Sequence, residues 1–251
     1  MTEGDVLGSF PVFLLLVWKH LRLPKPTKVQ YSLARFLADG PRRRGIQGYR
    51  GVGKSWITAA YALWRLLKNP DEHILVVSAS KQRADDFSSF CLRLIHEMPL
   101  LESLKPGPTQ RSSLVAFDVG GATVSQSPSL TSKGISSQIT GNRATLIIFD
   151  DVEVPNNSAT YEARQKLTAR VAESEAILTP GGDIVILGTF QSSESIYLGL
   201  IEGGAYEFRF YPVRYPAAED VYTVYRGLLD PDITEALRAR PELAGKPTDP
   251  T

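Results

Sequence analysis

The residues with the most specific chemistry lie at positions 48–55, where the sequence reads GYRGVGKS. This segment matches the pattern G-x-x-x-x-G-K-[ST] at every defined position. Glycines let successive backbone N–H groups turn toward phosphate oxygens, and the N-terminal end of a following helix adds positive potential. Lys54 is expected to reach the β- and γ-phosphates of ATP, and the Ser55 hydroxyl is expected to bind Mg²⁺. The residues expected to surround the nucleotide here are Gly48, Tyr49, Arg50, Gly51, Val52, Gly53, Lys54, Ser55 and Trp56.

A magnesium-dependent phosphate loop also needs carboxylates at the end of a neighbouring strand. The apolar run 146–149 is followed by Asp150, Asp151 and, two residues later, Glu153. Asp150 is expected to hold the metal, directly or through water. Either Asp151 or Glu153 would orient or deprotonate the attacking water, and the sequence leaves both open.

A third set of polar residues follows the apolar run 184–187, where the sequence continues with Gly188, Thr189, Phe190 and Gln191. A polar side chain at the tip of the strand beside the phosphate loop can sense the γ-phosphate. Thr189 and Gln191 are therefore expected to contribute to the nucleotide site.

The elements that must position these side chains alternate between helix and strand. Three short runs are apolar on both faces, as in a parallel sheet covered by helices, and lie at 74–77, 146–149 and 184–187. Apolar patterning predicts a helix that begins with the run 10–18 and ends before Pro24, and a helix that starts at Lys54 and continues through 56–67. Further helices are expected at 27–38, 84–98 and 161–175. A hairpin is expected from 114–118 and 122–125, around Gly120 and Gly121. Before the phosphate loop only Ile46 is clearly apolar, which makes that strand weakly patterned.

Composition restricts the class of protein. The chain has 251 residues, 43% of them hydrophobic, which suits one large domain or one domain with a small appendage. The single cysteine, Cys91, excludes an intrachain disulfide. The longest apolar run, 10–18, is too short to cross a bilayer, so no membrane partner is expected.

Charge is unevenly distributed although the formal net charge is only +1. Residues 1–60 carry ten Lys and Arg against three Asp and Glu, whereas residues 111–251 carry 12 basic and 18 acidic side chains. The basic end could therefore face phosphate, or it could be an ordinary solvated face. The last 36 residues, 216–251, are punctuated by prolines and weakly periodic, which predicts a linker or a fragment of a further element.

Taken together, these motifs resemble the ATPase domain of the large terminase subunit of tailed double-stranded DNA phages, the short-tailed type in particular. The similarity covers about residues 10–215. The segments that carry it are PTKVQ at 26–30, RGVGKSWIT at 50–58, QITGNRA at 138–144, DDVE at 150–153, LGTFQ at 187–191 and SIY at 195–197.

The resemblance implies a three-layer α/β P-loop NTPase of the RecA-like (ASCE) branch, with a mostly parallel central sheet and an extra strand between the Walker A and Walker B motifs. It implies an ATP- and Mg²⁺-dependent motor that drives double-stranded DNA into a procapsid. The basic N-terminal third, including Arg42, Arg43 and Arg44, would then be the first place to expect contacts with DNA phosphates. The implied partners are the portal protein and the small terminase subunit. The implied assembly is a homo-oligomeric ring, a pentamer by family resemblance, with the isolated chain a monomer as an alternative. The implied location is the host cytoplasm, at the portal vertex.

The resemblance also implies a division of the chain. Residues 1–40 would be a helical lead with the adenine-side motif, residues 41–215 the ATPase core, and residues 216–251 a linker toward a C-terminal nuclease domain. Because no such domain fits after residue 215, an excised ATPase domain without nuclease activity is expected.

Individual residues take roles by the same resemblance. Gln30 would read adenine, since its amide both donates and accepts. Arg50 could act on the γ-phosphate in cis, and Arg143 could act as an arginine finger on a neighbouring subunit; the sequence does not decide between them. Many relatives have Glu directly after the metal-binding Asp, where this chain has Asp151, which leaves the position of the attacking water open.

Two other functions stay open. A P-loop helicase, translocase or kinase would share the phosphate loop, although the sequence shows no clear arginine-rich kinase lid. A non-catalytic module, in which ATP only switches DNA affinity, would share the whole nucleotide site.

Overall fold

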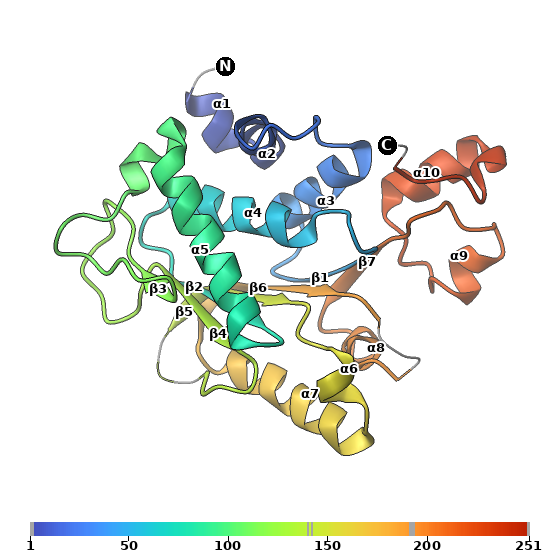
Figure 1. The fold of residues 1–251 in the computed structure, drawn as a ribbon. Helices are drawn as coiled ribbons and strands as arrows, with labels where there is room; N and C mark the ends of the chain where they lie inside the picture. The colour runs from blue at the N-terminus through green and yellow to red at the C-terminus, as the bar shows by residue number, and fades with distance from the viewer. Residues whose placement is uncertain (1–2, 140, 142, 191–193, 250–251) are drawn as a thin grey trace.

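A seven-stranded sheet runs through the middle of the molecule (Figure 1). The computed structural model describes residues 3–139, 141, 143–190 and 194–249. The strand order is β3-β4-β2-β5-β6-β1-β7, and all neighbouring pairs are parallel except β3 and β4. The bounds are β1 Arg43–Gly48, β2 Ile74–Ser78, β3 Ala116–Phe117, β4 Leu130–Gly134, β5 Ala144–Asp150, β6 Leu178–Gly188 and β7 Glu207–Tyr211.

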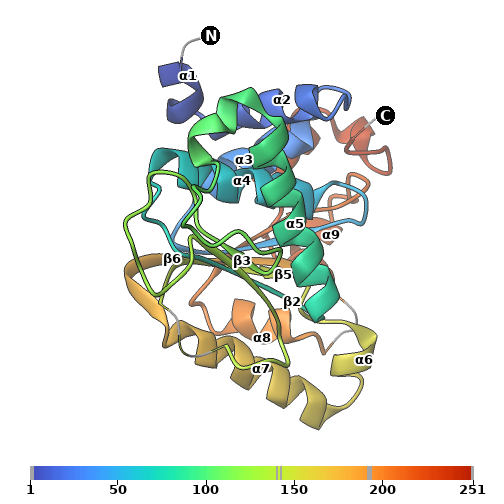
Figure 2. The ribbon, with the colours of Figure 1, turned by 60° about the vertical axis from the view of Figure 1, so that its left-hand side comes forward.

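Helices cover both faces of this sheet (Figures 1 and 2). One face carries α1 (Glu3–Gly8), α2 (Phe10–His20), α3 (Lys28–Asp39), α4 (Lys54–Lys68), α5 (Lys81–Glu97) and the short η1 (Pro99–Leu104). The other carries α6 (Pro155–Ser158), α7 (Tyr161–Glu175) and α8 (Ile196–Glu202). The expected three-layer α/β class is confirmed, and the predicted helices and the three apolar strands all form.

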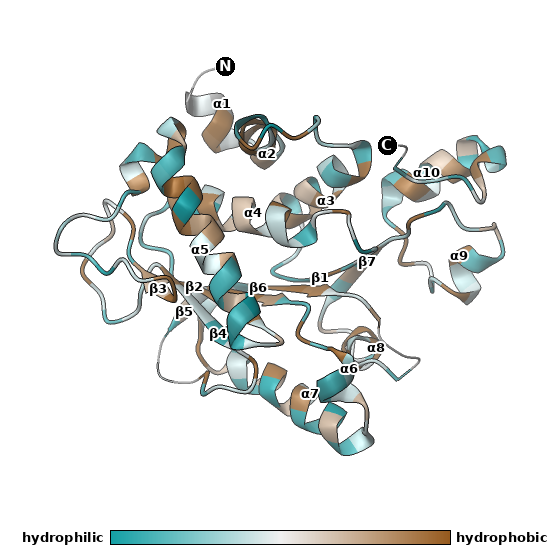
Figure 3. Cartoon of the chain, viewed as in Figure 1, coloured by the Kyte–Doolittle hydropathy of each residue, from teal (hydrophilic) through white to brown (hydrophobic). Residues whose placement is uncertain are grey.

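The central strands are apolar on both sides because each side meets a separate core. In β5, Leu146 and Ile148 belong to the core under α2–α5, whereas Ile147 and Phe149 belong to the core over α7 and α8. Figure 3 shows hydrophobic residues concentrated on the strands and α2, while α7 and α10 carry many hydrophilic residues. Among the described helices, none is both long and apolar enough to cross a membrane.

The strand order brings three loop regions to one edge of the sheet. Strand β6 lies between β1 and β5 and pairs in parallel with both, with Gln47 opposite Gly188 and Asp150 opposite Leu187. The carboxyl ends of parallel strands are where ligands bind in such sheets. In the sheet, β6 thus lies between β1, which leads into the phosphate loop, and β5, which ends at Asp150. This confirms the extra strand expected between the two motifs.

Strand β1 forms despite its weak apolar pattern because a polar network buries its basic start. Arg44 is only 1% exposed. Its guanidinium donates to the Tyr61 hydroxyl at 2.6 Å and lies 3.3 Å from Asp183. Arg65 lies 2.9 Å from the same Asp183 carboxylate and also pairs with Glu72. The network joins β1, β6 and α4 at the amino edge of the sheet.

This network corrects the expectation that Arg42, Arg43 and Arg44 form a DNA-binding cluster. Arg44 is buried and paired, and Arg43 lies 3.2 Å from the Glu175 carboxylate. Of the three, only Arg42 has an exposed side chain without a carboxylate partner among the described residues.

The predicted hairpin at 114–118 and 122–125 is wrong. Residues 116–117 form β3 but pair antiparallel with β4, and residues 122–125 form no strand. The glycine turn packs elsewhere: the Gly120 N–H donates to Leu104 O at 3.1 Å, and a Cβ at Gly120 would lie 2.3 Å from Ser103 O. The Thr123 N–H then donates to the Asp71 carboxylate at 2.7 Å, which leads the chain away from β3.

The segment predicted as a weakly structured linker is packed on the core through residue 249. It forms α9 (Asp220–Thr223), α10 (Pro231–Ala239) and η2 (Pro241–Leu243), beside β7 (Figure 1). Its apolar residues Val221, Leu229, Ile233 and Leu237 are buried in the two cores. Asp230, which is 0% exposed, adds polar contacts to α3 and β7. Its carboxylate accepts from the Ser32 hydroxyl of α3 at 2.8 Å and lies 3.6 Å from the Arg209 guanidinium of β7.

We expect Asp230→Ala to lower the free energy of unfolding by about 3 kcal/mol, because it leaves the Arg209 charge beside an empty buried site. Urea denaturation followed by circular dichroism measures this loss. The matched control is Asp232→Ala on the same helix, whose partner Arg35 is half exposed and whose loss should cost less than about 1 kcal/mol. Equal losses for the two variants would contradict this role for Asp230.

Candidate functional site

The phosphate loop connects β1 to α4 and depends on two left-handed glycines. Gly51 has φ 95° and Gly53 has φ 86°, a region that other residues rarely adopt. Gly53 directly precedes α4, which begins at Lys54 as predicted. The loop therefore presents backbone N–H groups and a helix N-terminus to the carboxyl edge of the sheet.

Lys54 is folded back into its own loop. Its ammonium donates to Gly48 O at 2.8 Å and to the Thr189 hydroxyl, beyond β6, at 3.3 Å. The side chain is buried, and desolvation lowers the pKa of Lys54, an effect that nearby Asp151 and Asp150 oppose. A bound phosphate would favour the charged amine in the same way, because an opposite charge raises the pKa of a lysine.

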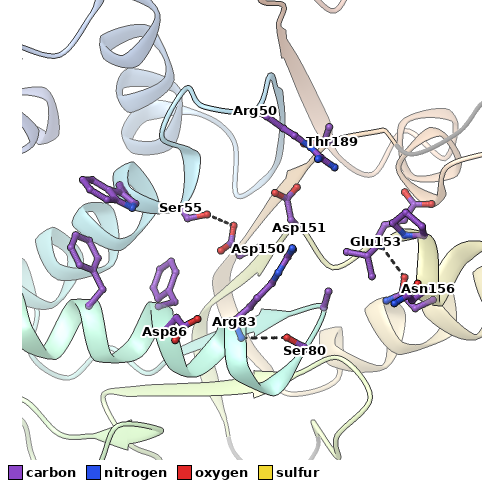
Figure 4. A pocket seen from close by; sticks show the side chains of 17 residues that line it. Arg50, Ser55, Ser80, Arg83, Asp86, Asp150, Asp151, Glu153, Asn156 and Thr189 are labelled. Carbon is purple, nitrogen blue, oxygen red and sulfur yellow. Dashed lines mark hydrogen bonds between the residues drawn. The ribbon is translucent and has the colours of Figure 1, made fainter.

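Ser55 and Asp150 meet across the edge of the sheet. The Ser55 hydroxyl donates to Asp150 Oδ1 at 2.9 Å, as Figure 4 shows. Asp150 is 8% exposed, and burial, together with the nearby Asp151 charge, raises the pKa of Asp150 to about 6. A hydroxyl beside a carboxylate is a donor set that suits Mg²⁺.

These two residues fit a metal that is completed by its substrate. Among the described residues there is no group of three His, Cys, Asp or Glu side chains that could hold a metal ion. Mg²⁺ usually keeps several waters and binds one or two protein ligands together with substrate phosphates. Ser55 and Asp150 therefore match a nucleotide-bound magnesium rather than a metal held by protein alone.

Asp151 faces the phosphate loop. Its backbone is left-handed, with φ 47°, and its N–H donates to Leu187 O at 3.0 Å, which ties it to β6. The side chain points toward Arg50 and Thr189 in Figure 4. Its Oδ1 atom is buried and has no hydrogen-bond partner among the described residues. Asp151 also lines both cavities that meet at the loop, so its carboxylate lies where a water beside the phosphates could be oriented.

Glu153 is directed away from the phosphate loop, and its carboxylate hydrogen-bonds to the start of α8. It is 1% exposed and accepts from the Ser195 hydroxyl and from the Ile196 N–H at 3.3 Å. Its own N–H donates to the Tyr197 hydroxyl at 3.2 Å. Burial raises the pKa of Glu153. The two carboxylates that the sequence left open thus have different surroundings.

Two cavities meet at the phosphate loop. One, of 880 Å³, lies on the side of α5 and α6 and is lined by Asp150 and Glu153. The other, of 1130 Å³, lies on the side of α2 and α3 and is lined by Gln30 and Lys54. Both are lined by Arg50, Ser55, Trp56 and Asp151. A nucleotide whose phosphates occupy the loop would therefore have one cavity for its base and another beside its γ-phosphate.

The two predicted arginines lie at opposite ends of the molecule's central strands. Arg50 is exposed in the phosphate loop and extends toward Thr189 (Figure 4). Arg143 is exposed directly before β5, so the whole strand separates it from Asp150. The structure brings Arg50, and not Arg143, to the acidic pair of the same chain.

Sequence reasoning missed Arg83. This residue lies in the first turn of α5, whose N-cap is Ser80, and it lines the cavity of 880 Å³. In Figure 4 its guanidinium points toward Asp151, and its positive charge opposes the rise in the pKa of Asp150. The available signal was its place just after β2, a parallel strand whose carboxyl end lies beside that of β5.

Gln30 already uses both ends of its amide. Its Oε1 accepts from the Thr27 N–H at 3.0 Å, in the capping box of α3, and its Nε2 donates to Val52 O at 3.0 Å. It therefore joins α3 to the phosphate loop.

Trp56 is 46% exposed, and its ring lies 5.5 Å from that of Phe90. Gln191, predicted beside Thr189, lies outside the described residues.

Comparisons with known proteins identify the family to which the chain is similar. The family model for the N-terminal part of the large terminase subunit, T4-like virus type, matches residues 46–182. The large terminase subunit of Enterobacteria phage T3 is 44% identical over 254 residues, which is 100% of this chain and 43% of that protein. The chain thus spans less than half the length of this relative.

Solved structures show the same fold at low identity. The large terminase of bacteriophage HK97 aligns with a TM-score of 0.52 and 13% identity, over 88% of this chain and 46% of that one. A mutant ATPase domain of a Thermus phage large terminase aligns with a TM-score of 0.50 and 15% identity, over 90% of this chain and 93% of that one. S. cerevisiae Dbp5 aligns with a TM-score of 0.52 and 14% identity, over 86% and 60%. On the family match and the identity to the phage T3 protein, the chain belongs to the large-subunit family of phage terminases.

Proposed function

We propose that this chain is the ATPase motor domain of a phage terminase and that it hydrolyses ATP to translocate double-stranded DNA into a procapsid. The observation that carries the proposal is the contact between Ser55 and Asp150 beside Lys54, which places a magnesium-binding pair next to a phosphate loop. Family membership supports the DNA-packaging context.

In this proposal the backbone N–H groups of the loop and Lys54 bind the β- and γ-phosphates, and Ser55 and Asp150 hold the metal. Mg²⁺, when bound, neutralises charge on the β- and γ-phosphate oxygens. Lys54 exchanges its contact with Gly48 O for a phosphate, while its neighbour Thr189 reports the presence of the γ-phosphate to β6.

Asp151 is our choice for the residue that orients the attacking water. It lines both cavities at the phosphate loop, whereas the Glu153 carboxylate already accepts from the Ser195 hydroxyl and the Ile196 N–H. Because Asp151 is one methylene shorter than the usual Glu, its left-handed backbone and its tie to Leu187 O help to set where its oxygens lie.

Arg50 is our choice for the arginine that stabilises charge on the γ-phosphate, and it acts in cis. It is the one of the two predicted arginines that lines the cavities beside the acids. Arg143 would have to act on the site of a neighbouring subunit, because β5 separates it from its own.

The remaining proposals concern the whole terminase, of which this chain corresponds to 43% in the phage T3 relative. We propose double-stranded DNA, the portal protein and the small terminase subunit as partners, a homo-oligomeric ring as the active form, and the portal vertex in the host cytoplasm as the place of action. Nuclease activity is not expected from these residues. The DNA is held by its backbone without sequence readout, as a motor that moves any sequence requires.

A non-catalytic nucleotide switch is the second candidate, and the observation that favours it is the identity of Asp151. With this shorter side chain, the site could bind Mg²⁺·ATP while the carboxylate fails to bring a water close enough for attack. Multiple turnovers of ATP distinguish the two functions.

We expect the chain to hydrolyse ATP and Lys54→Ala to lower turnover by about 100-fold, because it removes a charge aimed at the transferred phosphate. Phosphate release is measured over a range of protein concentrations, with and without linear double-stranded DNA. The control is Lys68→Ala, at the far end of the same helix. With Arg50 in cis, the rate rises linearly with protein, whereas a steeper rise would favour Arg143 in trans. Binding of ATP without any turnover would contradict the motor and support the switch.

Replacing the two open carboxylates should separate their roles. Asp151→Asn should lower kcat by about 100-fold with little change in thermal stability, as loss of a general base does. Glu153→Gln should lower the melting temperature, because it weakens the hydrogen bonds to Ser195 and Ile196 at the start of α8. It should lower kcat by less than about tenfold. Steady-state kinetics and thermal denaturation of both variants check this. A larger kcat loss for Glu153→Gln at unchanged stability would reverse the assignment.

The pKa of Asp150 predicts how metal dependence changes with pH. Because its folded pKa is raised to about 6, a proton competes with Mg²⁺ for the carboxylate below that pH. The Mg²⁺ concentration for half-maximal turnover should therefore rise about tenfold per pH unit below the pKa and stay constant above it. Titration of Mg²⁺ at each pH measures this, and excess Mg²⁺ should restore turnover. A half-maximal concentration that does not change with pH would contradict the role of Asp150.

A further inference from the structure

The segment 245–249 crosses from β7 to the α2–α3 side of the phosphate loop. Its course is fixed by backbone contacts: the Gly245 N–H donates to Tyr215 O at 2.8 Å and the Thr248 N–H donates to Val213 O at 3.1 Å. The Thr248 hydroxyl donates to Pro212 O at 2.6 Å, and Thr248 is 5% exposed. We call residues 245–249 the strap.

The end of the strap joins both sides of the cavity of 1130 Å³. Asp249 Oδ2 accepts from the Thr27 hydroxyl at 2.7 Å and from the Tyr49 hydroxyl at 3.1 Å. Thr27 is the N-cap of α3 and contacts Gln30, whereas Tyr49 belongs to the phosphate loop. Burial raises the pKa of Tyr49, so its hydroxyl remains a donor to Asp249 at neutral pH.

The walls of this cavity suit a flat heteroaromatic ring. Trp18 lines it from α2, Leu23 and Pro24 line it from the α2–α3 connection, and Val213 and Pro247 line it from the chain after β7. Apolar and aromatic walls with a few polar groups are typical of a ligand pocket. The polar groups among them include Gln30, Thr27 and Asp249.

We propose that the strap is one wall of the site for the nucleotide base, and that Asp249 is a positioning residue that holds Tyr49 and Thr27 around it. This inference rests on the proposed function. A chain of contacts runs from Asp249 through Thr27 and Gln30 to Val52 O, so the carboxylate helps to hold the start of α3 at the edge of the base site. Nucleotide binding and docking of the strap then stabilise each other by the same free energy, because such coupling is reciprocal.

The test compares a nucleotide with a ligand that has no base. We expect Asp249→Ala to raise the Kd of ATP and of ADP about tenfold, which corresponds to the loss of a hydrogen-bonded contact or two. The Kd of inorganic tripolyphosphate should change by less than about twofold, because that ligand occupies only the loop. At saturating ATP, kcat should stay near the parent value, so the effect falls on KM. Isothermal titration calorimetry and steady-state kinetics measure these quantities.

Two further variants keep the test independent of folding. Tyr49→Phe keeps the ring but removes the donor to Asp249, and it should weaken ATP more than tripolyphosphate. Glu242→Ala, exposed in η2 of the same C-terminal segment, should leave both affinities unchanged. Thermal melts show whether each variant is folded at the assay temperature.

The outcomes are distinct. If Asp249→Ala raised the Kd of ATP and the Kd of tripolyphosphate equally, the strap would not be a wall of the base site. The effect of the substitution would then lie on the phosphate loop alone. Unchanged ATP affinity in a folded Asp249→Ala protein would overturn the inference while the proposed ATPase stands. Failure of the parent chain to bind any nucleotide would overturn the proposed function and the inference with it.

Discussion

The parallel pairing of β6 with both β1 and β5 is the constraint on which the rest of the site depends. It sets the phosphate loop, Asp150 and Thr189 at one edge of the sheet, at neighbouring strand ends. Once the strands are in this register, the Ser55–Asp150 and Lys54–Thr189 contacts need only short side chains or a single lysine stem to form. The two cores on either side of the sheet keep this register, because a shift by one residue would exchange the side chains that face them.

Burial separates the acidic residues that follow β5 into different roles. Asp150 is placed against a hydroxyl, Asp151 is turned into the cavity by its left-handed backbone, and Glu153 is enclosed by the start of α8. If these three carboxylates, which lie within four positions of the chain, pointed to the same place, their negative charges would repel one another. The direction of each side chain, more than whether it is Asp or Glu, decides its role. Asp150 can bind a metal, Asp151 can orient a water, and Glu153 contacts the start of α8.

The sequence predicts most of this architecture where its signals are local. Apolar runs at β2, β5 and β6 and the glycine pattern of the loop identify the strands and the edge where the site forms. The misses have long-range causes. Strand β1 depends on the burial of Arg44 by Asp183, and the packed C-terminal segment depends on the contact of Asp230 with Ser32, about 200 positions away. Arg83 could be noticed only once β2 was placed beside β5. The direction of Glu153 depends on its contacts with Ser195 and Ile196, and the SIY segment at 195–197 does not by itself show that it packs against this carboxylate.

The contacts around Arg44 and those around the phosphate loop differ in the groups on which they end. At the amino edge, Arg44, Arg65 and Asp183 join β1, β6 and α4 through charge-assisted bonds within the protein. At the carboxyl edge, the Lys54 amine and the Ser55–Asp150 pair use on protein atoms the same groups that a nucleotide and its metal would engage. A ligand therefore exchanges partners at the carboxyl edge and leaves the network at the amino edge intact.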